Sequence, residues 1–324
     1  MTAYVLLTFG LVVLVVAGDL LVRGAVAIAV RLGIPTLIIG LTIVAFGTSA
    51  PELVISLGAA LSDAPGIALG NVVGSNIANI LLVLGLPSIL YATRCDEPGL
   101  LRNTAFMLVA TAVFIALAFT TPLHVWQGTV LVVLMAAFLW DSGVRARRAV
   151  NGLAPADGPD AAAEKPAGKA LLAAAMVVAG LIGLPVGAHL AVTGAREIAL
   201  AWGMSDAAVG LTVVAVGTSL PELAATTMAA LRRESAIAVG NVIGSNVFNL
   251  LAIMGLTAIA APVPVAPGVL HVDLWVMLAS SLAVVPFVYW RWRIGKLAGL
   301  AFVAVYFIYV AMGVGARSTA LAGS

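Results

Sequence analysis

The sequence predicts an all-α membrane protein with ten transmembrane helices in two inverted five-helix repeats. Its 324 residues are 62% hydrophobic and only 9% charged, whereas an average soluble domain carries about 25% charged residues. Apolar segments long enough to cross a hydrocarbon core of about 30 Å recur along the chain, and similar stretches occur in both halves. The long apolar segments favour helices over a transmembrane barrel. The strands of a barrel are shorter, and apolar and polar residues alternate along them.

Breaks at Pro, Gly and charged residues divide the apolar segments into ten predicted spans. The first half contains 4–30, 35–61, 65–91, 103–120 and 125–145, and the second half contains 170–198, 206–231, 236–260, 272–290 and 297–315. The first basic residue is Arg23, so the N-terminal segment lacks the basic region of a signal peptide. We interpret it as a retained span.

The basic residues predict the orientation. With the N-terminus outside, the inside loops hold all but three of the 16 Lys and Arg residues. The exceptions are Arg23, Arg196 and Arg317. By the positive-inside rule, the sequence predicts an N-out and C-out protein.

The chain is expected to divide into a first repeat at 1–150, a linker at 151–169 and a second repeat at 170–324. The linker is rich in Ala, Pro and Gly and has no apolar periodicity. We therefore expect a flexible cytoplasmic connection. The single Cys95 excludes an internal disulfide and is expected to be a small buried or loop residue.

Two pairs of stretches relate the halves at a constant offset. Gly40–Leu57 and Gly210–Thr227 are identical at 11 of 18 positions, and Gly70–Gly85 matches Gly240–Gly255 at 9 of 16. The offset is 170 residues in both cases (210 − 40 and 240 − 70). Because each half has an odd number of spans, equivalent loops should lie on opposite sides of the membrane. Such inverted repeats are typical of secondary transporters.

Each half carries one glutamate inside an apolar segment, Glu52 or Glu222. A carboxylate at mid-bilayer costs roughly 2.5 to 3.5 kcal/mol, and such residues usually pair, face a wet cavity or serve transport. Gly47 and Pro51, with the equivalent glycine and proline of the second half, are expected to break each helix near its middle. Backbone carbonyls at such breaks can bind ions.

The polar residues of the motifs are all oxygen donors. Thr48 and Glu52 share one helix face, and Ser75 and Asn79 share a face of the next helix. The second half repeats this set as Thr218, Glu222, Ser245 and Asn249. Calcium binds six to eight oxygens, whereas softer metals prefer Cys and His, which the motifs lack. The pattern predicts a shared site for a hard cation where the halves meet.

The motifs GTSAPEL with GNVVGSNIANIL, and GTSLPEL with GNVIGSNVFNLL, resemble the two α-repeats of the calcium/cation antiporter superfamily. The whole chain looks most like the prokaryotic sodium/calcium exchangers. This resemblance implies a secondary active antiporter of the plasma (inner) membrane, not an enzyme. It would exchange sodium for calcium by alternating access, as a monomer, without a cofactor, nucleic acid or obligatory protein partner. Helices one and six would form a sliding gate over an eight-helix core.

The resemblance also implies the ion ligands. The calcium site would be formed by Glu52, Glu222, Thr48, Thr218 and the carbonyls of Ala45 and Ala215. The sodium sites would be completed by Ser49, Ser219, Ser75, Ser245, Asn79 and Asn249.

Two departures from related families bear on the coupling ion. Asn249 stands where potassium-dependent exchangers and some prokaryotic members carry Asp. Gly74 and Gly244 stand where calcium/proton exchangers typically carry Glu, which disfavours proton coupling. A calcium/proton exchanger, a potassium-dependent exchanger and an exchanger of another divalent cation are the alternatives.

Other interpretations of single residues stay open at this point. Ser49 to Glu52 also has the pattern of a capping box, and His189 is either a packing histidine or a pH sensor. Asp19 and Arg23 are expected to form a local ion pair. An ion channel would also select cations with carboxylates, but here inversion relates both glutamates in one chain. A hydrolase would need a nucleophile with a base or a metal-binding His pair, and the motifs contain no His.

Overall fold

The structure is a computed structural model that describes residues 2–152, 167–204 and 215–322. Most of the predicted linker, residues 153–166, lies outside the described residues. The same is true of residues 206–214, which begin the predicted span 206–231.

The described residues are almost entirely helical, with π-helical segments (η) inside several helices. The first half contains α1 (Thr2–Leu32), α2 (Thr36–Ile39), η1 (Gly40–Val44), α3 (Ala45–Thr48), α4 (Ala50–Leu61), α5 (Pro65–Ala78), η2 (Asn79–Leu84), α6 (Gly85–Leu90), β1 (Thr93–Arg94), α7 (Leu100–Ala118) and α8 (Val125–Gly152). The second half contains α9 (Ala167–Ala201), α11 (Ala215–Thr218), α12 (Leu220–Leu231), α13 (Ser235–Val247), η5 (Phe248–Ile253), α14 (Met254–Ala260), η6 (Val269–Asp273), α15 (Leu274–Ala283), α16 (Val285–Tyr289), β2 (Arg293–Ile294) and α17 (Lys296–Ala322).

Nine of the ten predicted spans correspond to helices of the described residues. Eight helices are long and apolar enough to cross a membrane, and the bent pair Thr36–Thr48 with Ala50–Leu61 makes a ninth. The tenth, 206–231, begins outside the described residues, so the count of ten stays a prediction. The predicted end of the fifth span at 145 is wrong for the helix, because α8 continues to Gly152. Arg and Ala favour helix and extend it past the apolar segment.

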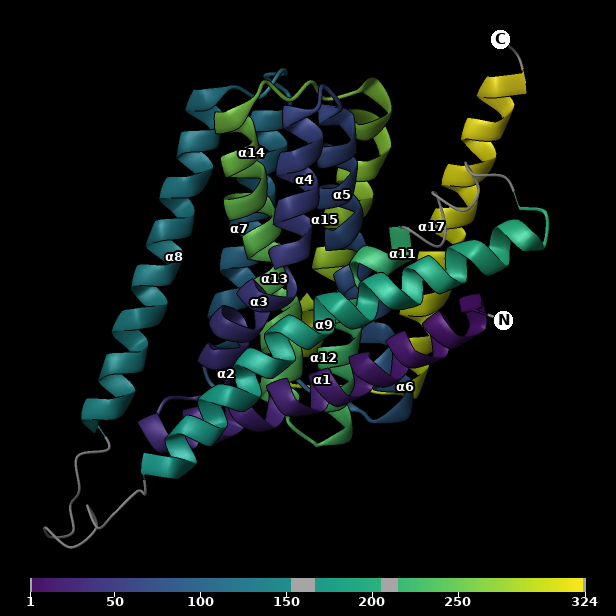
Figure 1. Cartoon of the computed structure of the whole chain (residues 1–324). Coiled ribbons are helices and arrows are strands. Elements are labelled where there is room, and N and C mark those ends of the chain that lie inside the picture. Colours follow the sequence, from purple (N-terminus) through teal and green to yellow (C-terminus); the bar gives the residue numbers. More distant parts are fainter. Residues whose placement is uncertain (1, 153–166, 205–214, 323–324) are drawn as a thin grey trace, which may run out of the picture.

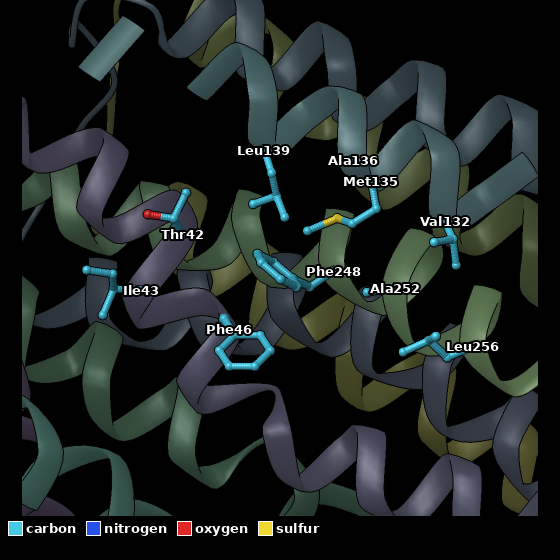
Figure 2. A pocket seen from close by; sticks show the side chains of 10 residues that line it. All are labelled: Thr42, Ile43, Phe46, Val132, Met135, Ala136, Leu139, Phe248, Ala252 and Leu256. Carbon is cyan, nitrogen blue, oxygen red and sulfur yellow. The ribbon is translucent and has the colours of Figure 1, made fainter. Parts of the chain in front are cut away.

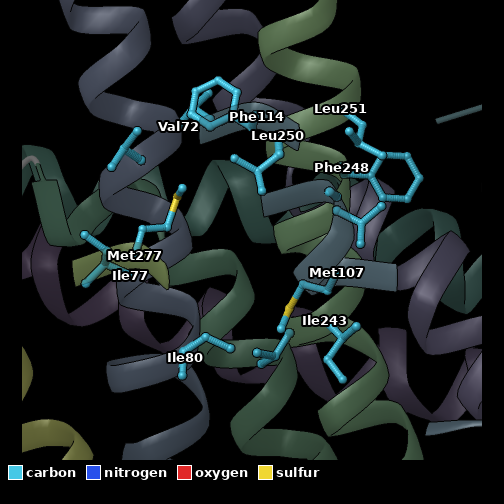
Figure 3. Packing of buried hydrophobic residues seen from close by; sticks show 14 of the residues in the cluster. Val72, Ile77, Ile80, Met107, Phe114, Ile243, Phe248, Leu250, Leu251 and Met277 are labelled. Carbon is cyan, nitrogen blue, oxygen red and sulfur yellow. The ribbon is translucent and has the colours of Figure 1, made fainter. Parts of the chain in front are cut away.

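The core is formed by the two spans that carry the repeated asparagines. Over their most apolar windows, Pro65–Leu90 is 78% buried and Ser235–Ala260 is 83% buried, whereas Val125–Gly152 is only 22% buried. Figure 3 shows apolar side chains from both halves packed together, among them Ile77 and Ile243. These two spans therefore form the centre of the bundle, and α8 lies at its edge (Figure 1).

Helices α1 and α9 lie side by side and cross the outside of this core diagonally (Figure 1). A Cβ atom at Gly10 would lie 2.4 Å from the Ala191 nitrogen, and one at Gly24 would lie 2.8 Å from the Ala173 oxygen. Since the start of α1 meets the end of α9, the two helices are antiparallel. Glycines allow their backbones to approach closely, as is common for helix pairs in membranes.

We expect Gly180→Ala to separate these two helices. The added Cβ would lie 2.6 Å from the Leu21 Cβ and 2.8 Å from the Ala17 oxygen, and overpacking of this kind costs about 1–3 kcal/mol. Thermal unfolding in detergent should show a lower Tm. Gly143→Ala is the matched control, because a Cβ there meets nothing within 4 Å. An unchanged Tm for Gly180→Ala would contradict the close contact.

Loops from different halves pair at both ends of the bundle. β1 pairs with β2 in antiparallel fashion, with Thr93 opposite Ile294. Leu123 and Val263 form an isolated antiparallel bridge with N–O distances of 2.8 and 2.9 Å. Helix α7 separates Thr93 from Leu123, so the two pairings lie at opposite ends. Val263 follows Thr93 by 170 residues (263 − 93), which means that equivalent loops make both contacts.

Candidate functional site

The helices that carry the glutamates are both interrupted at a serine. α3 and α4 meet at Ser49 with a bend of 44°, and α11 and α12 meet at Ser219. The two serines adopt nearly the same backbone conformation, with φ/ψ of −86°/2° and −88°/5°, in the sparsely populated region where many active-site residues lie. Pro51 and Pro221 are the second residues of the helices that follow, and proline has no N–H to donate. The predicted breaks are confirmed.

The interpretation of Ser49 as part of a capping box is wrong. Ser49 precedes α4, yet its side chain makes no cap hydrogen bond. Its hydroxyl donates instead to Glu222 Oε1 at 2.9 Å, 173 residues away. This hydrogen bond joins the break in one half of the chain to the glutamate of the other.

The two glutamates are buried without a cationic partner. Each is 1% exposed. Among the described residues, both carboxylate oxygens of Glu52 and the Oε2 of Glu222 lack a hydrogen-bond partner, and no ion pair includes either side chain. Burial of an unpaired carboxylate is costly. A bound cation would compensate this charge.

Two asparagines that the sequence analysis did not select support the glutamate backbones. Asn71 Nδ2 donates to the Glu52 carbonyl at 3.3 Å and to Ser56 Oγ at 2.9 Å. Asn241 Nδ2 contacts the Glu222 carbonyl at 3.5 Å and Thr226 Oγ1 at 2.9 Å. The signal was present in the sequence, because these residues are also 170 apart (241 − 71).

Asn241 also connects the halves. Its Oδ1 accepts a hydrogen bond from Thr48 Oγ1 at 3.2 Å. Thr48 lies 3.3 Å from the Ala45 carbonyl as well, which further accepts from the Ser49 N–H at 3.0 Å. The structure thus brings Thr48, Ser49 and Glu222 together, and it places the Ala45 carbonyl beside them.

A second group of amides lies at the π-helical segments of the core. Asn79 begins η2 and Asn249 lies in η5, and π-helical turns are frequent at functional sites. Asn79 Nδ2 donates to Asn246 Oδ1 at 3.1 Å. Within the described residues, four predicted ligands have a buried oxygen without a hydrogen-bond partner: Asn79 Oδ1 and Asn249 Oδ1 in these segments, Ser245 Oγ in α13, and Ser219 Oγ at the break before α12. The second amide pair, Asn76 and Asn246, was missed from the sequence, although it is also duplicated.

The remaining predicted ligands lie in the same elements. Ser75 is 4% exposed, near the end of α5. Ala215 and Thr218 begin and end α11. Within the described part of the chain, no group of three or more His, Cys, Asp or Glu side chains could hold a metal ion. A cation site here would therefore combine two carboxylates with neutral oxygens.

His189 and Asp19 occupy equivalent positions (189 − 19 = 170) with different surroundings. His189 lines a cavity of about 220 Å³ together with Pro51, Thr218 and Pro221, next to the break in each half. Asp19 pairs with Arg23 at 3.7 Å, as predicted, and also with Arg232 from the other half. Hence α9 borders a cavity at this position, whereas α1 forms an ion pair with the residue that follows α12.

A different cavity, of about 480 Å³, lies between η1, α3, α8, η5 and α14 (Figure 2). Figure 2 shows Phe46, Leu139 and Phe248 around it. Thr42 contributes the one polar side chain of its lining, and its hydroxyl donates to the Ile38 carbonyl at 2.6 Å. Because its walls are apolar, this cavity offers few oxygen ligands, unlike the site around the two glutamates.

The sodium/calcium exchanger protein family matches residues 2–142 and 172–314. The chain belongs to this family. The two matched segments start 170 residues apart (172 − 2), which equals the offset between the motifs. It is accordingly a multi-pass membrane protein and an antiporter of a family that transports calcium and sodium.

Individual relatives are similar along almost the whole chain. The putative antiporter CaxA of Alkalimonas amylolytica is 37% identical over 92% of this chain and 92% of its own. The sodium/calcium exchanger MaX1 of Methanosarcina acetivorans is 33% identical over 95% and 97%. A solved structure of the sodium-calcium exchanger NCX_Mj, soaked with Na⁺ and Sr²⁺, has a TM-score of 0.83 at 32% identity and covers 96% of this chain and 99% of that one.

Proposed function

We propose that this protein exchanges sodium for calcium across the membrane by alternating access, and that both cations bind between Glu52 and Glu222. The observation that carries the proposal is the burial of one carboxylate from each half, neither with a basic partner among the described residues. The Ser49 hydroxyl of the first half donates to the Glu222 carboxylate of the second. Two carboxylates balance one calcium ion or two sodium ions. The names of the relatives support the same choice of cations.

The proposed ligands are the residues of the duplicated motifs. Neutral oxygens around the carboxylates suit hard cations, and the buried oxygens without partners are available to them. The ligands comprise the side chains of Thr48, Ser49, Glu52, Ser75, Asn79, Thr218, Ser219, Glu222, Ser245 and Asn249, with the carbonyls of Ala45 and Ala215. Since one chain supplies all of them, we propose that a monomer is sufficient and that no cofactor takes part.

We also propose the inverted N-out, C-out topology for the exchanger. The antiparallel contact of α1 with α9 and the equivalent loop pairings at both ends of the bundle support the inversion. The basic residues of the predicted inside loops support the orientation. The moving elements would be α1 and α9, because they pack on the outside of the bundle and the two glutamates lie on other helices, α4 and α12.

Calcium uptake into vesicles tests the proposed function. Purified protein in vesicles loaded with sodium should take up calcium when diluted into sodium-free medium, and it should not do so when sodium is absent from both sides. Channel activity would instead let calcium follow its own gradient without a counter-ion. Uptake driven equally well by a proton gradient, without sodium, would identify a calcium/proton exchanger. Competition by manganese would reveal another divalent cargo.

The topology predicts that equivalent loops label from opposite sides. Ser62→Cys and Arg232→Cys are 170 residues apart (232 − 62) and both positions are exposed. An impermeant thiol reagent should reach the first from the outside and the second from the inside. The natural Cys95 should react slowly, because it is only 1% exposed. Burial also raises its thiol pKa to about 12, so little of the reactive thiolate is present. Labelling of both positions from one side would contradict the inverted repeat.

A further inference from the structure

Asn246 is a buried amide that the proposed ligand set leaves out. It lies in α13, is 1% exposed, and its Oδ1 accepts a hydrogen bond from Asn79 Nδ2 at 3.1 Å. Its own Nδ2 lies 3.6 Å from the sulfur of Met107 on α7. The Asn246 amide is therefore held between a proposed ligand and a buried methionine.

The methionine determines which way the Asn246 amide faces. A thioether sulfur can accept a hydrogen bond and has no proton to donate, so the NH₂ group of Asn246 turns toward Met107 and its oxygen turns toward Asn79. That oxygen attracts the NH₂ group of Asn79 and would repel its carbonyl. The Oδ1 of Asn79 consequently points away from Asn246, and it is buried with no hydrogen-bond partner among the residues that the structure describes.

The repeat-related pair, Asn249 and Asn76, is arranged differently from Asn79 and Asn246. Asn76, 170 residues before Asn246 (246 − 76), donates to the Val72 carbonyl at 2.7 Å. Within the described residues, neither polar atom of Asn249 has a partner, and the same holds for Asn76 Oδ1. The amide of Asn79 is thus oriented by a neighbouring amide, and that of Asn249 is not.

We propose that Asn246 is a positioning residue that holds the carbonyl oxygen of Asn79 toward a bound sodium ion. The inference rests on the proposed function, in which Asn79 is a sodium ligand. Without Asn246, the Asn79 carbonyl oxygen would no longer be held in the orientation that binds sodium. Calcium, balanced chiefly by the two carboxylates, would depend on it much less.

Asn246→Leu tests the proposal, because it removes the acceptor at a similar side-chain size. In vesicles, the half-saturating sodium concentration should rise roughly tenfold while that of calcium changes by less than about twofold, as expected for the loss of one hydrogen bond. Met107→Leu removes only the sulfur and should raise the half-saturating sodium concentration by a smaller factor. Met277 lies 170 residues after Met107 (277 − 107). Met277→Leu is therefore the matched control, and it should leave the half-saturating sodium concentration unchanged.

A double variant separates positioning from general packing. If Asn246 acts through Asn79, adding Asn246→Leu to Asn79→Ala should produce no further rise in the half-saturating sodium concentration, since coupled residues are not additive. The increase in Tm on adding sodium provides a readout that does not require transport. Additive effects, an unchanged sodium dependence of Asn246→Leu, or equal losses for sodium and calcium would overturn the inference. The proposed function fails separately, if the unmodified protein shows no sodium-driven calcium uptake.

Discussion

Glu52→Gln and Glu222→Gln should each reduce sodium-driven calcium uptake to the background of empty vesicles. Both carboxylates are buried, and calcium brings two positive charges, so a neutral amide leaves one of them uncompensated. An unpaired charge in a buried site costs about 3–5 kcal/mol, which corresponds to a loss of affinity of at least about a hundredfold. Initial rates of radioactive calcium uptake would measure the effect.

The same variants should remain folded. Removal of a buried carboxylate without a basic partner removes a desolvation cost, so the Tm without calcium should be equal to or higher than that of the unmodified protein. The rise in Tm on adding calcium should disappear. Asp63→Asn, in the exposed turn after α4, is the control and should retain uptake. Substantial calcium exchange by either glutamine variant would exclude these glutamates as the site.

Sodium-driven calcium uptake should proceed equally well with external potassium or choline once the membrane potential is clamped. Asn79 and Asn249 are neutral, so the two glutamates are the only formal charges in the proposed site. They balance one calcium ion or two sodium ions and offer no third charge to potassium. Parallel uptake assays in the two external media, with the potential held equal, would measure this. Uptake that occurs only with potassium would reassign the chain to the potassium-dependent exchangers.

Asn249→Asp is the matched variant for this prediction. It has nearly the same shape and adds a third carboxylate beside buried oxygens that lack partners. We expect calcium uptake by this variant to become severalfold dependent on a further cation, either potassium or a proton, because an additional buried charge must be compensated. The unmodified protein should show no such dependence in the same assay. An Asn249→Asp variant that behaves identically would show that residue 249 does not face the ions.

Much of the fold was predictable because its causes are local. Apolar segments of span length define helices, and nine of the ten predicted spans have a counterpart among the described residues. Proline lacks an N–H donor, so the breaks before Pro51 and Pro221 could be located to within two residues. The end of α8 could not, because hydropathy identifies where a helix leaves the apolar layer and contains no information about where the helix itself stops.

The candidate site was predictable in part, through duplication. The motif residues recur at a constant offset, which selected Glu52 and Glu222 before their burial was known. The same offset applied to Asn71 and Asn76, but neutral amides are common and carry no insertion cost comparable to that of a carboxylate. They could be distinguished only by what they touch.

The sequence alone determined that this chain crosses the membrane repeatedly, that its halves are duplicates, and that each half carries one costly carboxylate beside a helix break. These properties follow from composition, hydropathy and offset. Only the tertiary structure decided the partners. Ser49 donates to Glu222 rather than capping its own helix. Asn79 donates to Asn246, whereas the Asn249 amide has no hydrogen-bond partner in the part of the chain that the structure describes. A hydrogen bond depends on distances of about 3 Å between atoms, and a pair separated by more than 160 residues reaches that distance only when the two halves pack.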